Sequence, residues 1–263
     1  MTNTAAVSPV RPVALITGAS GGIGLEFAQR LAERGYDLIL VARRRDRLDD
    51  LAAQLRTAHA SVRAEVIVAD LADAATPARV AADVARLGLH VTLLVNNAGF
   101  GTHGHFEALA AEREHEEIEV NVQALVALTH AFLPGMLERG RGGVINVAST
   151  AAFQPVPYMA VYAATKAFVR SFSEALHEEV RARGVRVIAL CPGPTATEFF
   201  DSAVAAPRGP IRRVSEVVTT GLRAYDAGAP VAIDGTSNQL MIASSHLIPR
   251  RWATKIAGRI MHP

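Results

Sequence analysis

The sequence has little of what several protein classes require. It contains one cysteine, Cys191, so no disulfide can form within the chain, and residues 1–12 carry neither a strongly basic start nor a long apolar run. Both features favour a reducing, cytoplasmic environment. No stretch approaches the roughly 18 uninterrupted apolar residues of a membrane-spanning helix.

The sequence also lacks an excess of charge of one sign. Its 27 basic residues are scattered among 25 acidic ones, and the net charge is only +2. A nucleic-acid partner is therefore not expected, since such proteins concentrate basic residues in a patch or stripe. No cluster of histidine, cysteine and carboxylate residues has metal-ligand spacing, so we expect no metal ion. Without repeats or low-complexity tracts, the chain is expected to form one domain over 12–263 after a flexible tail over 1–11.

Short apolar runs alternate with longer amphipathic segments along the chain. This alternation predicts an α/β fold, a doubly wound sheet of seven mainly parallel strands with helices on both faces. The expected strands are Val13–Ile16, Leu38–Val41, Glu65–Ala69, Thr92–Val95, Gly143–Val147, Val185–Leu190 and Val231–Ile233.

A glycine cluster, Thr17-Gly18-Ala19-Ser20-Gly21-Gly22-Ile23-Gly24, lies between the first expected strand and an amphipathic helix. Glycines there allow a sharp turn and let the backbone approach a pyrophosphate, whose charge the start of the helix stabilises. An ordinary flexible turn is the alternative, but the strand before it and the helix after it favour a Rossmann-type dinucleotide site.

The spacing TGxxxGxG, together with the motifs that follow it, resembles the short-chain dehydrogenase/reductase family over about residues 12–200. In overall appearance the chain is similar to bacterial relatives of its 3-ketoacyl reductase and 17β-hydroxysteroid dehydrogenase branch. The further motifs, in the family's order, are Asp70-Leu71, Asn96-Asn97-Ala98-Gly99, Asn121, Ser149, Tyr162 with Lys166, and Pro192-Gly193 with Thr195 and Thr197.

The resemblance implies an oxidoreductase that moves a hydride between NADP(H) and a carbonyl or alcohol. Tyr162 would be the general acid or base, Lys166 would lower its pKa and hold the nicotinamide ribose, and Ser149 would bind the substrate oxygen. Asn121 would order a water in a proton relay. The cofactor-binding residues it implies are Gly18, Ser20, Gly22, Ile23, Gly24, Arg43, Arg44, Asp70, Leu71, Asn97, Ala98, Gly99, Tyr162, Lys166, Pro192, Gly193, Thr195 and Thr197.

Tyr162 and Lys166 are four residues apart in a helical segment, so their polar ends can meet one ligand. A free tyrosine has a pKa near 10, and use near neutral pH requires a drop of about 3 units, or roughly 4 kcal/mol. Taken alone, each of these residues also fits a structural role, such as a loop cap for Ser149 or a solvated helix position for Lys166. The three together favour catalysis, whereas a cofactor-binding sensor or scaffold without turnover is the alternative.

The end of the second expected strand reads Val41-Ala42-Arg43-Arg44. NAD sites place an acidic residue there, whereas a 2′-phosphate requires a cation, so Ala42 and Arg43 favour NADP(H). Some NADP-dependent relatives also carry a basic residue at the position of Gly21, which this chain lacks, and we expect Ser20 and Arg44 to compensate.

The expected substrate pocket contains Phe100, Phe153, Tyr158 and Phe199 with few fixed charges. This lining indicates a small-molecule substrate, an apolar carbonyl or alcohol compound with a medium or large carbon skeleton. Tyr158 lacks a lysine four residues on and is interpreted as a pocket or packing residue, not as the catalytic tyrosine.

The two long helical segments near 112–138 and 160–183 carry more apolar positions than one stripe, which predicts a homodimer or homotetramer. A basic amphipathic helix at about 249–261 has the apolar stripe Ile248, Trp252, Ile256 and Ile260. It either packs on its own domain or a neighbouring subunit, which we favour, or lies on an anionic membrane surface.

Overall fold

The computed structural model describes residues 11–199, 211–245 and 249–263, so nearly all of the tail expected over 1–11 lies outside the described residues. Seven strands form one sheet in the order β3-β2-β1-β4-β5-β6-β7, and each neighbouring pair is parallel. The predicted sheet is confirmed. The strands are β1 Val13–Thr17, β2 Asp37–Ala42, β3 Ala64–Val68, β4 Val91–Asn96, β5 Gly142–Val147, β6 Val185–Cys191 and β7 Val231–Ile233.

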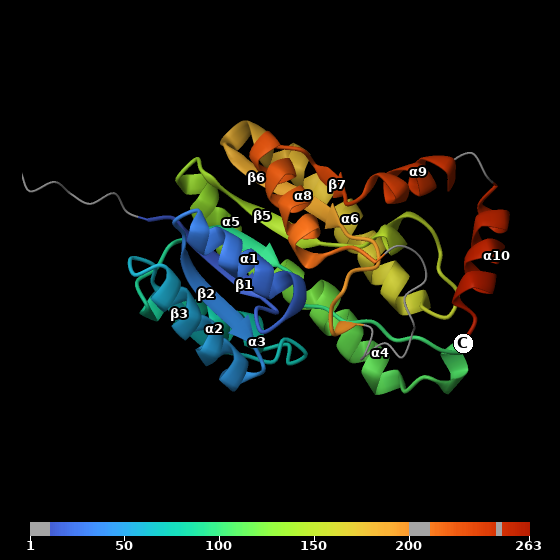
Figure 1. Ribbon diagram of the computed structural model, residues 1–263, viewed down its shortest axis with the longest axis horizontal. Helices are drawn as coiled ribbons and strands as arrows, with labels where there is room; N and C mark the ends of the chain where they lie inside the picture. The colour runs from blue at the N-terminus through green and yellow to red at the C-terminus, as the bar shows by residue number, and fades with distance from the viewer. Residues whose placement is uncertain (1–10, 200–210, 246–248) are drawn as a thin grey trace, which may run out of the picture.

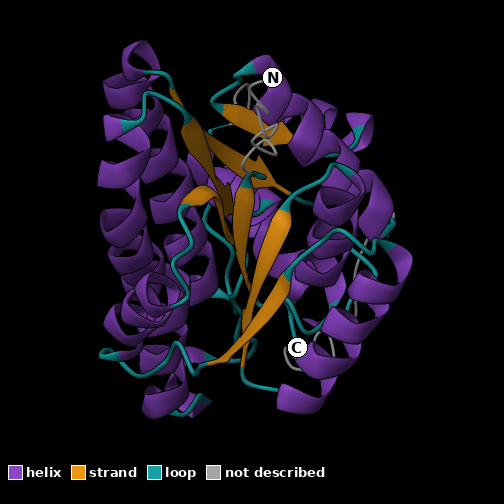
Figure 2. Ribbon diagram, turned by 90° about the vertical axis from the view of Figure 1, so that its left-hand side faces the viewer, coloured by secondary structure: helices purple, strands orange, loops and turns teal. Residues whose placement is uncertain are grey.

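Helices cover both faces of the sheet, and Figure 2 shows the strands as a central layer between them. One face carries α1 Gly22–Glu33, α2 Arg45–Ala58 and α8 Val214–Ala227, and the other carries α3 Thr76–Arg86, α5 Ala124–Glu138 and α6 Ala160–Val180. Because both faces are covered, the strands are near-continuous apolar runs, and all five residues of β1 are buried. The strand order reverses between β1 and β4, which places a crevice at their carboxyl ends.

One helical segment, Ala111–Glu138, is long and apolar enough to cross a membrane by length and composition. It consists of α4 Ala111–Ile118, the π-helical turn η2 Glu119–Gln123, and α5. Core helices of globular domains pass the same test, and α5 contacts β4, β5 and α3. We therefore interpret α5 as one layer of the doubly wound fold.

Shorter elements complete the described chain. The 3₁₀ turns are η1 Phe106–Ala108, η3 Thr150–Phe153 and η4 Arg181–Arg183, and the remaining helices are α9 Thr236–Ser245 and α10 Arg250–Met261. Figure 1 shows α10 at the edge of the molecule, beside the chain end and away from the central sheet.

The predicted C-terminal helix is present as α10, but most of the described part of its apolar stripe is left half-exposed, and Ile248 lies outside the described residues. Trp252, Ile256 and Ile260 are 52%, 46% and 46% exposed, whereas Ala257 is buried. A Cβ atom on Gly258 would lie 3.2 Å from Pro157, so this face is close to the loop before α6. Small residues let the helix approach the domain, and the larger apolar side chains are left half-exposed.

Apolar surface also remains on the outer side of α5 and α6. Phe168 is 43% exposed and stacks on Phe172 with ring centroids 5.9 Å apart, while Val126, Phe132 and Leu133 are only partly buried. We propose that this surface, the α5/α6 face, joins two copies of the chain.

We expect light scattering to report a particle of at least twice 27.9 kDa at micromolar concentration, and Phe168→Glu to shift it toward the monomer. A charge placed in an apolar interface without a partner disfavours association. Phe106→Glu is the control, because Phe106 is 64% exposed and belongs to η1, not to α5 or α6. A wild-type monomer, or equal effects of both substitutions, would contradict the proposal.

Candidate active site

The turn between β1 and α1 lies against the end of β4 with almost no space between them. Gly18 has φ +67°, and a Cβ atom on Gly24 would lie 2.4 Å from the Gly18 carbonyl oxygen. The Asn97 side chain donates to the Thr17 carbonyl oxygen at 2.9 Å, and the Thr17 hydroxyl accepts from the backbone N–H groups of Asn97 and Ala98, both at 3.0 Å. The glycines are therefore needed for close packing as well as for the turn.

A cavity of about 680 Å³ opens beside this turn and runs along the carboxyl ends of the strands. It is lined by every predicted cofactor residue except Gly24, whose place is behind the turn. Arg43 and Asp70, which follow β2 and β3, line one end, and Ser149, Tyr162 and Lys166 line the other. An extended dinucleotide fits this arrangement, because its phosphates would face the glycine turn.

Two arginines at the start of α2 surround the glycine turn. Arg44 donates to the Ser20 side chain at 3.0 and 3.1 Å and lies 3.1 Å from the position of a Cβ atom on Gly21. It also pairs with Glu198 at 2.7 Å, and Arg47 pairs with the same carboxylate. The Arg44 guanidinium is thus beside the position where some relatives carry a basic side chain.

Arg43 is less engaged than Arg44. Its guanidinium is 3.9 Å from the Asp70 carboxylate, and its side chain is largely exposed. Arg43 is therefore the more available cation at this end of the groove.

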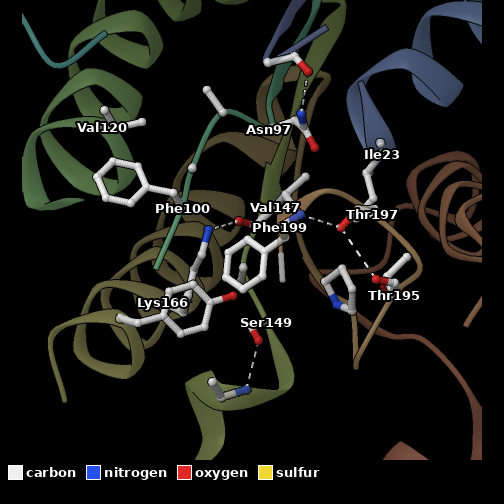
Figure 3. Close-up of a pocket in the computed structure, with 18 of the residues that line it drawn as sticks. Ile23, Asn97, Phe100, Val120, Val147, Ser149, Lys166, Thr195, Thr197 and Phe199 are labelled. Atoms are coloured by element: carbon white, nitrogen blue, oxygen red, sulfur yellow. Dashed lines mark hydrogen bonds between the residues drawn. The ribbon is translucent and has the colours of Figure 1, made fainter. Parts of the chain in front are cut away.

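Three of the four expected catalytic side chains, Ser149, Tyr162 and Lys166, line the other end of the cavity, whereas Asn121 does not. Figure 3 shows Ser149, Lys166 and Phe199 around this end. The Ser149 hydroxyl accepts from the Ala151 N–H at 3.1 Å and so caps η3. Lys166 donates to the Val147 carbonyl oxygen at 2.9 Å, and its Nζ is 5.8 Å from the centroid of the Tyr162 ring. Both Tyr162 and Lys166 are buried on α6.

Burial dominates the proton affinities of this pair. It raises the pKa of Tyr162 to about 12, against a smaller lowering by a hydrogen bond with Ser149, and it lowers the pKa of Lys166 to about 8. The expectation that Lys166 brings the pKa of Tyr162 down toward neutrality is not met. The cost of removing a phenolate from water outweighs the hydrogen bond with Ser149 that favours it.

Asn121 lies in the π-helical turn η2, a distortion that is frequent at functional sites. It is buried, and its amide bonds both backbone groups of Phe100, accepting from N–H at 3.1 Å and donating to C=O at 2.9 Å. It also donates to the Thr165 hydroxyl at 3.1 Å, which in turn donates to the Tyr162 carbonyl oxygen. The side chain expected to order a water therefore joins the loop after β4 to α6.

Two of the four expected pocket aromatics line the cavity and two do not. Phe100 and Phe199 line it, and the Phe199 ring is 5.4 Å from that of Tyr162. Phe153 instead packs beside the core with the Arg170 guanidinium 4.1 Å from its ring. Tyr158, at φ +66°, lines a separate small pocket with His105, because the turn before α6 directs it away from the main cavity.

Several residues in or beside the site are not predicted from the sequence. Glu198 follows Thr197 directly and pairs with arginines about 150 positions away in the chain. Glu117 is a fully buried carboxylate one helical turn before Asn121, and its place on an amphipathic helix gave no signal beyond ordinary surface charge. The α10 residues Ala257, Ile260 and Met261 also line the cavity, which the helical pattern alone could not reveal.

Residues 12–207 match the family model described as short chain dehydrogenase. The chain belongs to the short-chain dehydrogenase family. A bovine (Bos taurus) very-long-chain 3-oxoacyl-CoA reductase is 34% identical over 191 residues, which are 71% of this chain and 60% of that protein. The chain therefore matches less than two thirds of the length of this curated short-chain dehydrogenase.

Two solved short-chain dehydrogenases have the same fold. A Sphingobium yanoikuyae enzyme in complex with NADPH is 37% identical, with a TM-score of 0.81, over 90% of this chain and 94% of that one. A 3-ketoacyl-(acyl-carrier-protein) reductase from Brucella melitensis complexed with NADH is 30% identical, with a TM-score of 0.75, over 86% and 98% of the two chains. Family membership supports an oxidoreductase that acts on alcohol or carbonyl groups with a nicotinamide cofactor.

We expect Gly24→Ala to weaken cofactor binding strongly and to lower stability by about 1–3 kcal/mol, the usual cost of overpacking. The added methyl group would push the Gly18 carbonyl and Asn97 apart. Gly135→Ala is the matched control within helix α5, because its new methyl group would meet only the flexible end of Arg139. Thermal melting and cofactor titration measure both effects, and equal behaviour of the two variants would contradict this account of the turn.

Proposed function

We propose that the protein is an NADP(H)-dependent reductase of apolar ketones or aldehydes, which also oxidises the matching secondary alcohols. The observation that carries this proposal is the meeting of Ser149, Tyr162 and Lys166 in one cavity with the glycine turn. A sensor or scaffold would not require a proton donor at the nicotinamide end of the groove.

Each catalytic side chain has a distinct task. The hydroxyl groups of Ser149 and Tyr162 hold the substrate oxygen, and Tyr162 donates its proton to that oxygen during reduction. The Lys166 ammonium holds the nicotinamide ribose and stabilises the phenolate that the proton transfer leaves on Tyr162. When bound, the nicotinamide supplies the hydride in reduction and accepts it in oxidation.

The proton affinities suit reduction. With a pKa of about 12, Tyr162 is a phenol throughout the neutral range and is ready to donate. Oxidation requires the phenolate, so alcohol oxidation should need more alkaline conditions than carbonyl reduction.

The arginines support the choice of NADP(H). Ala42 leaves no carboxylate to accept from a ribose 2′-hydroxyl, and Arg43 and Arg44 line the same end of the groove. The NADPH complex of the Sphingobium relative agrees with this choice, whereas the Brucella relative was complexed with NADH. Glu198 weakens this support for NADP(H), because its carboxylate already pairs with Arg44, one of the two cations.

The lining of the substrate end favours an apolar compound. Around the Ser149 end the cavity wall is made mostly of carbon side chains, with Arg113 stacked 3.8 Å from the Phe100 ring. Its apolar members are Phe100, Val120, Val156, Met159, Phe199, Met241, Ala257, Ile260 and Met261. A bulky ketone or aldehyde would replace water against these surfaces.

The test of the function is a panel of ketones and aldehydes followed by the loss of NADPH absorbance. Tyr162→Phe, which removes only the hydroxyl group, should leave NADPH binding nearly unchanged and lower turnover by about 10²- to 10⁴-fold. Turnover of the variant near the wild-type level would exclude Tyr162 as the proton donor. A wild type that binds NADPH but reduces no member of the panel would favour the sensor or scaffold.

We expect the wild type to prefer NADPH to NADH in kcat/KM and the double variant Ala42→Asp, Arg43→Ala to narrow or reverse that preference. A charge-assisted contact to the 2′-phosphate contributes about 1.5–3 kcal/mol, or roughly 10- to 100-fold in affinity. Glu198→Gln is the opposite control, because it frees Arg44 and should strengthen the preference. Equal kcat/KM for the two cofactors in the wild type would refute this part of the proposal.

A further inference from the structure

Glu117 is a carboxylic acid in the interior of the protein, directly behind the wall of the active site. Its side chain is fully buried on α4, and Oε2 accepts from both the backbone N–H and the hydroxyl of Thr102 at 2.9 Å. The other oxygen, Oε1, is buried without a hydrogen-bond partner among the described residues. A buried ionisable side chain destabilises the fold relative to a well-packed apolar one, so its presence at this position suggests a function.

The loop held by Glu117 forms one side of the catalytic site. A Cβ atom on Gly101 would lie 2.8 Å from the Tyr162 ring, and one on Gly99 would lie 3.2 Å from the Lys166 Nζ. Thr102, the partner of Glu117, is the next residue of this loop. The same short loop therefore approaches the α6 pair and is held by Glu117.

The charged and titratable groups around Glu117 come from two helices. Its own helix supplies Glu114, which is also buried, and α6 supplies Tyr162 and Lys166. The Cys191 thiol of β6 also acts on Tyr162 and Lys166, but burial raises its pKa to about 12 and it stays neutral. Of these groups, Glu117 is the carboxylic acid whose charge acts on both Tyr162 and Lys166.

Burial raises the pKa of Glu117 to about 7, while the hydrogen bonds from Thr102 and the charge of Lys166 act to lower it. Its carboxylate in turn raises the pKa of both Lys166 and Tyr162. The interaction is reciprocal, as for any pair of coupled titrating groups.

We infer that Glu117 is a positioning residue that acts through Lys166 and Tyr162: its negative charge keeps Lys166 protonated and keeps the Tyr162 phenol from ionising. The catalytic importance of this inference rests on the proposed function, whereas the charge coupling itself does not. A purely structural role, in which Glu117 only anchors Thr102, is the competing explanation. Glu117→Gln separates the two, because the amide oxygen can still accept both bonds from Thr102 but carries no charge.

The first measurement needs no turnover and follows the melting temperature of wild type and Glu117→Gln from pH 5 to pH 8. The folded pKa of Glu117, about 7, exceeds the ordinary value of 4.5, so the unfolded chain releases this proton first. The contribution of Glu117 to the free energy of unfolding therefore falls as pH rises from 4.5 to 7. The melting temperature of Glu117→Gln should rise relative to wild type across this range, and a constant difference would overturn the inference.

The second measurement tests the coupling by combining Glu117→Gln with Lys166→Met in a double-mutant cycle of melting temperatures. The two effects should be non-additive at pH 7.5, where both side chains carry charge, and additive at pH 5, where Glu117 is neutral. Additive effects at both values would show that Glu117 does not act through Lys166.

The third measurement is the pH dependence of kcat for reduction. Without the carboxylate, Lys166 loses its proton at lower pH, so the alkaline decline of Glu117→Gln should begin about one unit below that of wild type, roughly a tenfold change in ionisation constant. Thr102→Val is the matched control: it keeps the carboxyl group of Glu117 but removes one hydrogen bond to its ionised form, and should move the ionisation of Glu117 to higher pH.

The outcomes of these measurements distinguish a failure of the proposed function from a failure of the charge coupling. A wild type without turnover whose melting temperatures show the coupling would refute the proposed function and leave the coupling in place. An active wild type with the same pH profile as Glu117→Gln would refute the role of Glu117 in catalysis.

Discussion

The close approach of the β1–α1 turn to the end of β4 is the contact on which the rest of the site depends. Gly18 and Gly24 leave no room for a side chain, and Asn97 and Thr17 join the two strands by hydrogen bonds. The strand order reverses at this point, so the groove opens here between helices that cover opposite faces of the sheet. The same contact that completes the core therefore exposes the backbone that a pyrophosphate would approach.

Burial has a second consequence at the other end of the groove, where it sets the charges of the proposed catalytic groups. Tyr162, Lys166 and Glu117 are all removed from water, and the neutral form of each gains stability relative to its charged form. A phenol that keeps its proton can donate to a carbonyl oxygen, while a lysine that titrates near pH 8 responds to a neighbouring carboxylate. Interactions between charges that would be weak at the surface are therefore stronger in the interior.

The C-terminal helix connects substrate binding to the outer surface of the molecule. Ala257, Ile260 and Met261 of α10 line the cavity, although Trp252 and Ile256 on the same helix stay half-exposed. His103 bonds the Met261 carbonyl oxygen at 2.7 Å, so the end of α10 is attached to the loop that also carries Thr102. The size of the proposed substrate site therefore depends on a helix that contributes little to the central core.

Local patterns in the sequence were enough to predict the seven strands, the glycine turn and the motifs after β3, β4, β5 and β6, because each depends on residues close together in the chain. Of the 18 cofactor-binding residues that the family resemblance implies, 17 line the cavity, but many of its other lining residues were not predicted. Only the tertiary structure placed Glu198 on Arg44, Glu117 behind Tyr162 and α10 over the substrate end, since these contacts join distant segments. It also reversed the expected pKa change of Tyr162, because the cost of burial depends on the depth at which the folded chain encloses a side chain.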